Sequence, residues 1–291
     1  MHLAVIFSLA LGLRGGFFDN EILAKKLGLE NPNANSEVIQ SLCPQVDEKE
    51  WVETKSGTSF NGLRLAPLAE GGFGMIYTFE RPDGTKKVLK ELKIDNQTVL
   101  NYAMNEVNIG LRISESKKAR SVEGLESIAH YESCSSIFEE LEAARIFITM
   151  PFYELGNLRD FMKENVNEGF TTSFDWKIKI LKKLLVGVHL LHLNGYIHRD
   201  IKPENILMES QDQPVIADYG FIKAGTRAET LLGTFVYMAP ELKLAQAYDN
   251  SVDVFALGVT FFEILNSYNY RIKGNPYDSI VEHCEPKNQS K

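Results

Sequence analysis

The hydrophobic pattern of this 291-residue chain changes near its middle. Between about residues 60 and 152, short apolar runs are separated by turn-forming residues, and Arg81-Pro82-Asp83-Gly84 predicts a hairpin turn between two of them. After Gly156, apolar residues recur with helical spacing, most regularly from 177 to 193. Strands followed by helices predict an α+β protein with two lobes.

Further segments fill in this division. Residues 97–113 have helical spacing inside the strand-rich half, and residues 128–131 and 146–152 have the apolar character of strands. The residues that precede this pattern carry no motif with a chemical meaning. We therefore expect an N-terminal extension at 1–58 and one domain at 59–291, whose lobes divide after about residue 152.

The octapeptide His198-Arg199-Asp200-Ile201-Lys202-Pro203-Glu204-Asn205 follows an apolar, helical run. Phosphoryl transfer to a hydroxyl needs a carboxylate that accepts the proton, a cation near the moving group and an oxygen ligand for Mg²⁺. Asp200, Lys202 and Asn205 supply these three groups. The alternative interpretation is a polar turn after a helix, which would not require this combination of side chains.

Several segments, in order along residues 60–291, resemble the motifs of eukaryotic Ser/Thr protein kinases. The segments are a glycine-rich loop (68–76), a lysine-bearing strand (88–90), a hinge (149–154), a catalytic loop (198–205), an Asp-Tyr-Gly motif (218–220), the end of an activation segment (233–241) and an Asp-led helix (253–258). The resemblance implies a bilobal fold, with a small antiparallel β-sheet lobe and a larger, mainly helical lobe. It also implies an enzyme that transfers the γ-phosphoryl group of ATP to Ser/Thr hydroxyls of protein substrates.

The resemblance assigns catalytic roles to individual residues. Lys90 would pair with the α- and β-phosphates of ATP, and Glu106 on the following helix would fix its side chain. Asp200 would be the base and Lys202 the electrostatic clamp. The pattern around Lys202 and that of the segment 233–241 are of the Ser/Thr type.

The resemblance also implies the cofactors ATP and Mg²⁺. Asn205 and Asp218 offer the hard oxygen ligands that suit Mg²⁺. Contacts with the nucleotide would come from the glycine-rich loop, the lysine-bearing strand and the hinge. The expected contact residues are Ala69, Gly71, Gly74, Ile76, Val88, Lys90, Met150, Pro151, Tyr153 and Asn157.

Other residues of the family pattern support or regulate the reaction. His198 would hold the catalytic loop, and Asp253 would brace the backbone of this loop. Thr234 would contact the catalytic residues, while Thr226 and Thr230 are candidate phosphorylation sites.

Departures from the family pattern motivate a second hypothesis, a weakly active or inactive pseudokinase that acts as a nucleotide-binding scaffold. Ala69 replaces the first glycine of the loop. Gly110 stands four residues after Glu106, where the family has an apolar side chain, so we expect weaker packing of this helix. The sequence ends 50 residues after Glu241, so we also expect a shortened helical lobe.

The composition limits the classes of partner. A net charge of −8 argues against a nucleic-acid surface, which would be basic. The hydrophobic fraction of 44% is ordinary for a globular protein, and no apolar run reaches the roughly 20 residues that span a bilayer. We expect ATP and a protein substrate as partners, no nucleic acid and no membrane span. The sequence does not indicate an oligomeric state.

Three cysteines bear on the location of the protein. Cys43, Cys134 and Cys284 are too few and too widely spaced for a disulfide framework or a zinc site. Reduced thiols and a cytoplasmic location are therefore expected. Residues 3–13 are nearly all apolar and leave open the alternative of a secretory signal, although the Met-His start lacks the usual Lys or Arg.

Overall fold

The computed structural model contains two compact units, and each is described by itself. The structure describes residues 43–46, 51–54, 57–71, 74–94, 97–119, 124–138, 144–165, 169, 173–220, 223–224, 236–244 and 247–266. Of these, the sheet unit contains the residues up to Glu154 and also 218–220. The helical unit contains the residues from Leu155 to Ala217 and those from Lys223 onward.

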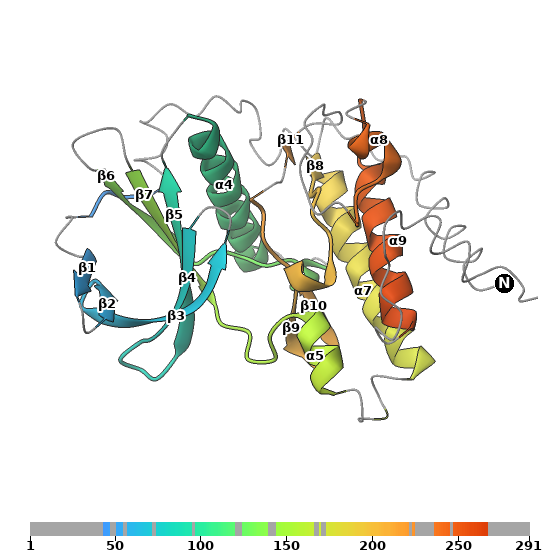
Figure 1. The fold of residues 1–291 in the computed structure, drawn as a ribbon, viewed down its shortest axis with the longest axis horizontal. Coiled ribbons are helices and arrows are strands. Elements are labelled where there is room, and N and C mark those ends of the chain that lie inside the picture. The colour runs from blue at the N-terminus through green and yellow to red at the C-terminus, as the bar shows by residue number, and fades with distance from the viewer. Residues whose placement is uncertain are drawn as a thin grey trace, which may run out of the picture. The chain divides into compact units, whose positions relative to one another are not determined.

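The sheet unit is built on one antiparallel sheet, as expected (Figure 1). The strand order among the described residues is β1-β2-β3-β4-β5-β7-β6, and all neighbouring strands are antiparallel. The strands are β1 (Trp51–Thr54), β2 (Gly57–Phe60), β3 (Leu63–Gly71), β4 (Gly74–Glu80), β5 (Lys86–Ile94), β6 (Ser133–Phe138) and β7 (Ala144–Pro151). The sheet begins at Trp51, before the predicted start of the domain at residue 59.

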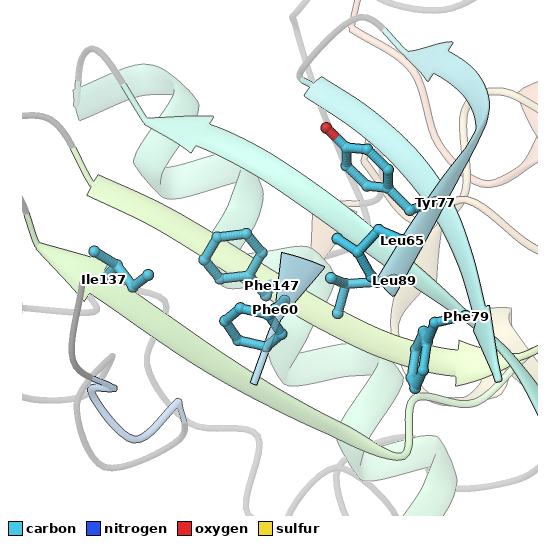
Figure 2. Close-up of a cluster of buried hydrophobic side chains, with 7 residues drawn as sticks. All are labelled: Phe60, Leu65, Tyr77, Phe79, Leu89, Ile137 and Phe147. Atoms are coloured by element: carbon cyan, nitrogen blue, oxygen red, sulfur yellow. The ribbon is translucent and has the colours of Figure 1, made fainter. Parts of the chain in front are cut away.

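The sheet is curled, as contacts between side chains of strands far apart in its order show. The rings of Trp51 on β1 and Phe147 on β7 stack with their centroids 4.9 Å apart. The register shifts between Pro67 and Ala69 in β3, the strand that is visibly curved in Figure 1. The curl encloses a core of buried apolar side chains, drawn in Figure 2. They are Phe60, Leu65, Tyr77, Phe79, Leu89, Ile137 and Phe147.

The predicted hairpin turn and the first predicted helix are both present. Gly84 N donates to Arg81 O at 2.9 Å, and Gly84 takes a φ of +81°, which glycine adopts without strain. The helix α4 (Gln97–Ala119) extends past the predicted end at residue 113 and contacts β5.

One of the two further strands predicted in this half is wrong. A 3-10 helix (Leu125–Ser127) occupies the chain before residues 128–131, and β6 begins only at Ser133. Short apolar runs do not distinguish strands from other buried segments, which explains the error. The strand predicted at 146–152 is confirmed as β7.

Cys43 and Cys134 form a disulfide bond, so the expectation of reduced thiols is wrong for this pair. The bond ties the chain before β1 to β6. Val46 N donates to Ser136 O at 2.9 Å, and Ser136 N donates to Pro44 O at 3.0 Å, so the backbone follows the same connection. Cys284 lies outside the described residues.

The helical unit contains α5 (Leu158–Glu164), α7 (Phe174–Leu193), α8 (Pro240–Lys243) and α9 (Ser251–Leu265). Its two short antiparallel ladders join β9 (Ile206–Ser210) to β10 (Gln213–Ile216) and β8 (Tyr196–Ile197) to β11 (Lys223–Ala224). The helix α7 is the one predicted at 177–193. It contacts α9 and β10, and the fully buried side chains of Ile180 and Leu184 belong to its inner face.

The described residues include no helix that is both long and apolar enough to cross a membrane. Several predictions concern residues outside the described ranges. They are the apolar stretch 3–13 and the threonines Thr226, Thr230 and Thr234.

Candidate active site

Lys90 lies within β5 and makes two ion pairs. Its Nζ is 2.6 Å from Glu106 Oε1 on α4 and 2.9 Å from Asp218 Oδ1. β5 is paired on both sides, with Lys90 opposite Ile76 of β4 and Ile148 of β7, so the position of its backbone is fixed. The structure thus brings three of the predicted site residues together within the sheet unit.

The surroundings of this cluster determine its charge. Burial alone would lower the pKa of Lys90, but the carboxylates of Asp218 and Glu106 outweigh this effect and raise the pKa. Burial raises the pKa of Glu106, against the opposing effect of the Lys90 charge. Lys90 is therefore a persistent cation that can attract phosphate oxygens.

The space beside Gly110 is filled, so the expected weakness in helix packing is wrong. Gly110 lies on α4 one turn after Glu106, and a Cβ added there would be 2.1 Å from Cδ2 of Tyr131. Tyr131 Oη donates to Glu106 Oε1 at 2.7 Å. Sequence reasoning missed Tyr131 because it placed this residue in a generic strand.

The loop 198–205 turns back on Asp200. Lys202 Nζ is 2.6 Å from Asp200 Oδ2, and Asn205 Nδ2 donates to the same oxygen at 2.8 Å. A 3-10 turn (Pro203–Asn205) makes this return possible, and proline suits its first position because that position needs no N–H donor. The three predicted residues of the loop therefore lie together in the helical unit.

Asp253 on α9 contacts the backbone of this loop, as expected. Its Oδ1 accepts from Arg199 N at 2.7 Å, and its Oδ2 accepts from His198 N at 2.8 Å. Burial alone would raise the pKa of Asp253, but its hydrogen bond with His192 and the neighbouring donors hold the pKa below its ordinary value. Arg199 takes a φ of +69°, an unusual conformation for a residue with a side chain, and Asp253 stabilises it.

The predicted glycine-rich loop is the hairpin of β3 and β4. Ala69 pairs with Ile76, and Gly71 pairs with Gly74. A Cβ added to Gly74 would lie 2.1 Å from the backbone oxygen of Glu91, so the close approach of β4 to β5 requires glycine at this position.

The remaining predicted nucleotide contacts are divided between the units. Val88 of β5 pairs with Met150 of β7, Pro151 ends β7 and Tyr153 follows it in the sheet unit. Asn157 belongs to the helical unit, where its Oδ1 accepts a hydrogen bond from the backbone of the first turn of α5 at 3.0 Å. Its predicted contact with the nucleotide stays a prediction.

Residues 64–285 match the protein kinase domain family. The chain belongs to the protein kinase family. Its curled antiparallel sheet and its helices confirm the α+β kinase fold that the sequence motifs predict. Members of this family generally use ATP and Mg²⁺.

Curated relatives of this chain include two Ser/Thr protein kinases and a mitogen-activated protein kinase kinase. The Ser/Thr protein kinase cds1 of Schizosaccharomyces pombe is 35% identical, over 63% of this chain and 43% of its own length. The mitogen-activated protein kinase kinase mkk2 of Aspergillus fumigatus is 33% identical, over 75% of this chain and 42% of its own length. The Ser/Thr protein kinase MST20 of Pyricularia oryzae is 26% identical over 68% and 20%. This chain therefore spans less than half of the length of these relatives.

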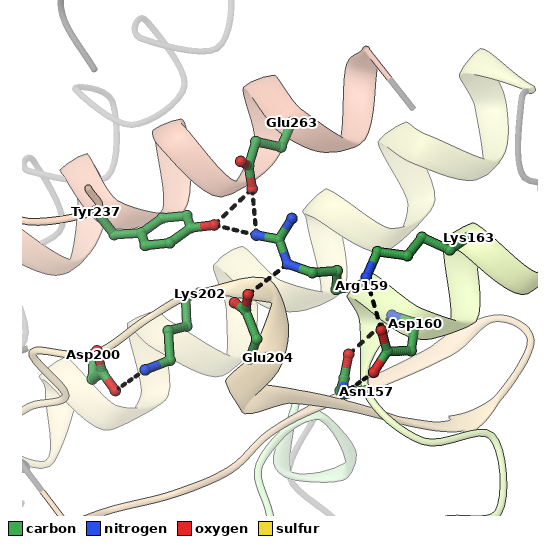
Figure 3. Close-up of polar contacts among 9 residues, drawn as sticks. All are labelled: Asn157, Arg159, Asp160, Lys163, Asp200, Lys202, Glu204, Tyr237 and Glu263. Atoms are coloured by element: carbon green, nitrogen blue, oxygen red, sulfur yellow. Dashed lines mark hydrogen bonds and ion pairs between the residues drawn. The ribbon is translucent and has the colours of Figure 1, made fainter. Parts of the chain in front are cut away.

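A polar network that the sequence does not signal lies beside the loop 198–205 (Figure 3). Arg159 on α5 donates to Glu204 Oε1 at 2.5 Å, to Glu263 Oε2 on α9 at 3.0 Å and to Tyr237 Oη. Tyr237 Oη donates to Glu263 at 2.7 Å. Burial raises the pKa of Tyr237, with help from the Glu263 hydrogen bond, so the phenol stays a neutral donor. The network links α5, α9, the catalytic loop and the chain before α8.

Proposed function

We propose that this protein transfers the γ-phosphoryl group of ATP to Ser or Thr hydroxyls of protein substrates. The observation that carries the proposal is the arrangement of Asp200. Its surface is only 3% exposed, and its carboxylate accepts hydrogen bonds from Lys202 and Asn205. A carboxylate held by two neighbouring donors suits a base that must meet a hydroxyl in one orientation. Asp253 supports the same loop through its backbone.

In the proposed reaction, Asp200 orients the substrate hydroxyl and accepts its proton. The hydroxyl oxygen bonds to the γ-phosphorus while the bond between that phosphorus and the β–γ bridging oxygen breaks, and ADP leaves with the bond's electrons. Lys202, 2.6 Å from Asp200, supplies positive charge where the transferring group is negative.

Lys90 is proposed to bind the α- and β-phosphates, and Glu106 is proposed to fix its orientation. The ion pair of 2.6 Å and the burial of Glu106 support this division of roles. Backbone groups of Pro151 and Tyr153 and apolar groups of Val88 are proposed to contact adenine.

Asn205 and Asp218 are the proposed ligands of Mg²⁺. Asn205 uses its amide nitrogen for two hydrogen bonds with Asp200, so its amide oxygen is the atom that suits a cation. Asp218 adds a carboxylate whose side chain is 42% exposed. Hard oxygen donors of this kind fit Mg²⁺, which would neutralise phosphate charge when bound.

One of the observations that motivated the alternative of a pseudokinase scaffold, the glycine at residue 110, no longer supports it. The expected gap at Gly110 is filled by Tyr131, and the ion pair of Lys90 and Glu106 is formed. The proposal of an active kinase is therefore the better supported of the two.

The test is transfer from radiolabelled ATP with Mg²⁺ to a mixture of Ser- and Thr-containing peptides. Asp200→Asn should lower the rate at least about 100-fold, because the base is lost, while a fluorescent ATP analogue still binds. The matched control is Asp212→Asn, in the exposed turn between β9 and β10, which should leave the rate unchanged. A wild-type protein that binds ATP but transfers nothing would overturn the proposal in favour of the scaffold.

A further inference from the structure

Gly110 stands inside α4, where glycine is an unfavourable residue for a helix, so its presence needs a physical reason. A Cβ added there would lie 2.1 Å from Tyr131 Cδ2 and 2.4 Å from Tyr131 Cγ. Tyr131 N also donates to Gly110 O at 3.2 Å, which holds the two backbones together. The ring of Tyr131 can lie against α4 because residue 110 has no side chain.

This close approach brings a phenol to the carboxylate of Glu106. Tyr131 Oη donates to Glu106 Oε1 at 2.7 Å, and the same oxygen accepts from Lys90 Nζ at 2.6 Å. Tyr131 is 2% exposed, so the hydrogen bond is made away from solvent, where it is stronger. Two donors on one oxygen fix the carboxylate, and the carboxylate in turn fixes Lys90.

A second tyrosine continues the contact toward Asp218. The rings of Tyr131 and Tyr219 have centroids 5.6 Å apart and are tilted by 43°. Tyr219 Oη donates to Ala129 O at 2.6 Å, which satisfies the buried hydroxyl. Because Tyr219 directly follows Asp218, the ring of Tyr131 lies beside the segment that carries the second carboxylate bound to Lys90.

We propose that Tyr131 is a positioning residue for the Lys90–Glu106 pair, and that Gly110 serves to admit its ring. The inference rests on the proposed phosphoryl transfer and deepens it, since Lys90 is the residue assigned to the ATP phosphates. Tyr131 itself touches neither substrate nor nucleotide in this scheme. It acts through Glu106.

The first test is Tyr131→Phe, which keeps the ring and removes the hydrogen bond. We expect the KM and the Kd for ATP to rise about tenfold, because a hydrogen bond to a charged group is lost, with the melting temperature lowered by only about 3–6 °C and the KM for peptide nearly unchanged. A purely structural role would lower the active fraction and leave the KM for ATP unchanged.

The matched control is Tyr77→Phe. Tyr77 is also buried in the sheet unit, and its Oη donates to a different carboxylate, Glu91 Oε2, at 3.4 Å. This variant should keep the ATP affinity of the wild type. Equal ATP affinity in Tyr131→Phe and Tyr77→Phe would overturn the proposal.

The second test separates filling of space from hydrogen bonding. Gly110→Leu combined with Tyr131→Ala moves apolar volume from residue 131 to residue 110 without restoring the phenol. The double variant should melt above Tyr131→Ala alone, while its ATP affinity stays about tenfold below that of the wild type. Wild-type ATP affinity in the double variant would overturn the positioning role.

Failure of this inference can be distinguished from failure of the proposed function. Binding of a fluorescent ATP analogue does not require transfer, so the Tyr131 variants can be compared even if the wild type transfers no phosphate. A wild type that transfers phosphate, with a Tyr131→Phe variant of unchanged ATP affinity, would leave the proposed function standing and refute the inference.

The disulfide carries a second, independent inference. Cys43 is 0% exposed and Cys134 is 6% exposed, so thiol reductants have little access to the bond. Ser136 Oγ also donates to Cys43 O at 2.9 Å, beside the two backbone hydrogen bonds of the same segment. Structural disulfides of this kind are rare in the reducing cytosol. We infer that the chain folds in an oxidising, secretory compartment.

The test is the thiol state and location of the full chain expressed in eukaryotic cells. A maleimide is added at lysis under denaturing conditions, the protein is then reduced, and a second label is added before peptide mapping. Cys43 and Cys134 should carry the second label alone, in a chain recovered from the secretory fraction. In a Cys43→Ala control, Cys134 should take the first label. First label on both residues of the wild type, or recovery from the cytosolic fraction, would overturn the inference.

Discussion

Replacement of Cys43 and Cys134 by alanine should remove a large share of the stability of the sheet unit. The two residues are 91 positions apart, and the disulfide is buried against β6. The loop-entropy relation gives about 4.6 kcal/mol at 25 °C for a closed loop of this length. For a domain of about 150–250 residues, such a loss lowers the melting temperature by roughly 10–15 °C.

The assay is thermal unfolding followed by circular dichroism, with and without dithiothreitol. Oxidised wild type should melt well above the double variant, and wild type that is reduced in denaturant and refolded in dithiothreitol should melt near it. The double variant itself should not respond to the reductant, and Cys284→Ala provides the control for loss of one thiol. A double variant that melted within about 2 °C of the oxidised wild type would show that the bond does not restrict the unfolded chain.

Two further changes test the buried polar contacts of the helical unit. Asp253→Asn should lower stability by about 2–3 kcal/mol and slow phosphoryl transfer, because the backbone of the catalytic loop loses a charged acceptor. The pKa of Asp253 is depressed in the folded protein, so its carboxylate stabilises the fold above about pH 4. This stabilisation is lost as the pH falls through the pKa that Asp253 has in the folded state. Asp253→Asn should therefore show a flatter acid-unfolding curve than the wild type. Arg159→Met should lower the unfolding free energy by about 3–5 kcal/mol, because it leaves Glu263 buried without its cation.

Denaturant unfolding and pH titration of the variants check these two expectations. Lys163→Met is the matched control for Arg159→Met, since Lys163 lies on the same helix in an exposed ion pair worth less than about 1 kcal/mol. Equal losses of unfolding free energy in Arg159→Met and Lys163→Met would contradict the stabilising role of the buried network. An acid-unfolding curve unchanged by Asp253→Asn would contradict the charge assigned to that residue.

The parts of the site that lie on short, ordered motifs could be predicted from the sequence. Lys90, Asp200 and Asn205 each belong to a compact segment whose residue types are needed for the same chemistry. The ion pair with Glu106 could also be predicted, because the resemblance to the kinase family implies a glutamate partner for Lys90 on the helix that follows. Local patterns contain enough information for such residues.

Contacts between distant segments could not be predicted. Gly110 alone indicates a missing side chain, and its compensation by Tyr131 depends on where a second segment lies in space. The disulfide has the same character, because no short spacing relates Cys43 to Cys134. The incorrect strand at 128–131 shows the complementary limit, since an apolar run reports burial without fixing the backbone conformation.

The attachment of residues 44–46 to Ser136 also has a consequence for self-association. Among the described strands, β6 is the last in the order of the sheet, and the edge of a sheet offers N–H and C=O groups that can recruit a strand from another molecule. Backbone pairing at Ser136 occupies part of this edge, and the disulfide keeps the covering segment in place. Reduction would therefore do more than loosen the domain: it would free a template for intermolecular β-pairing, so a reduced sample should aggregate from a folded state.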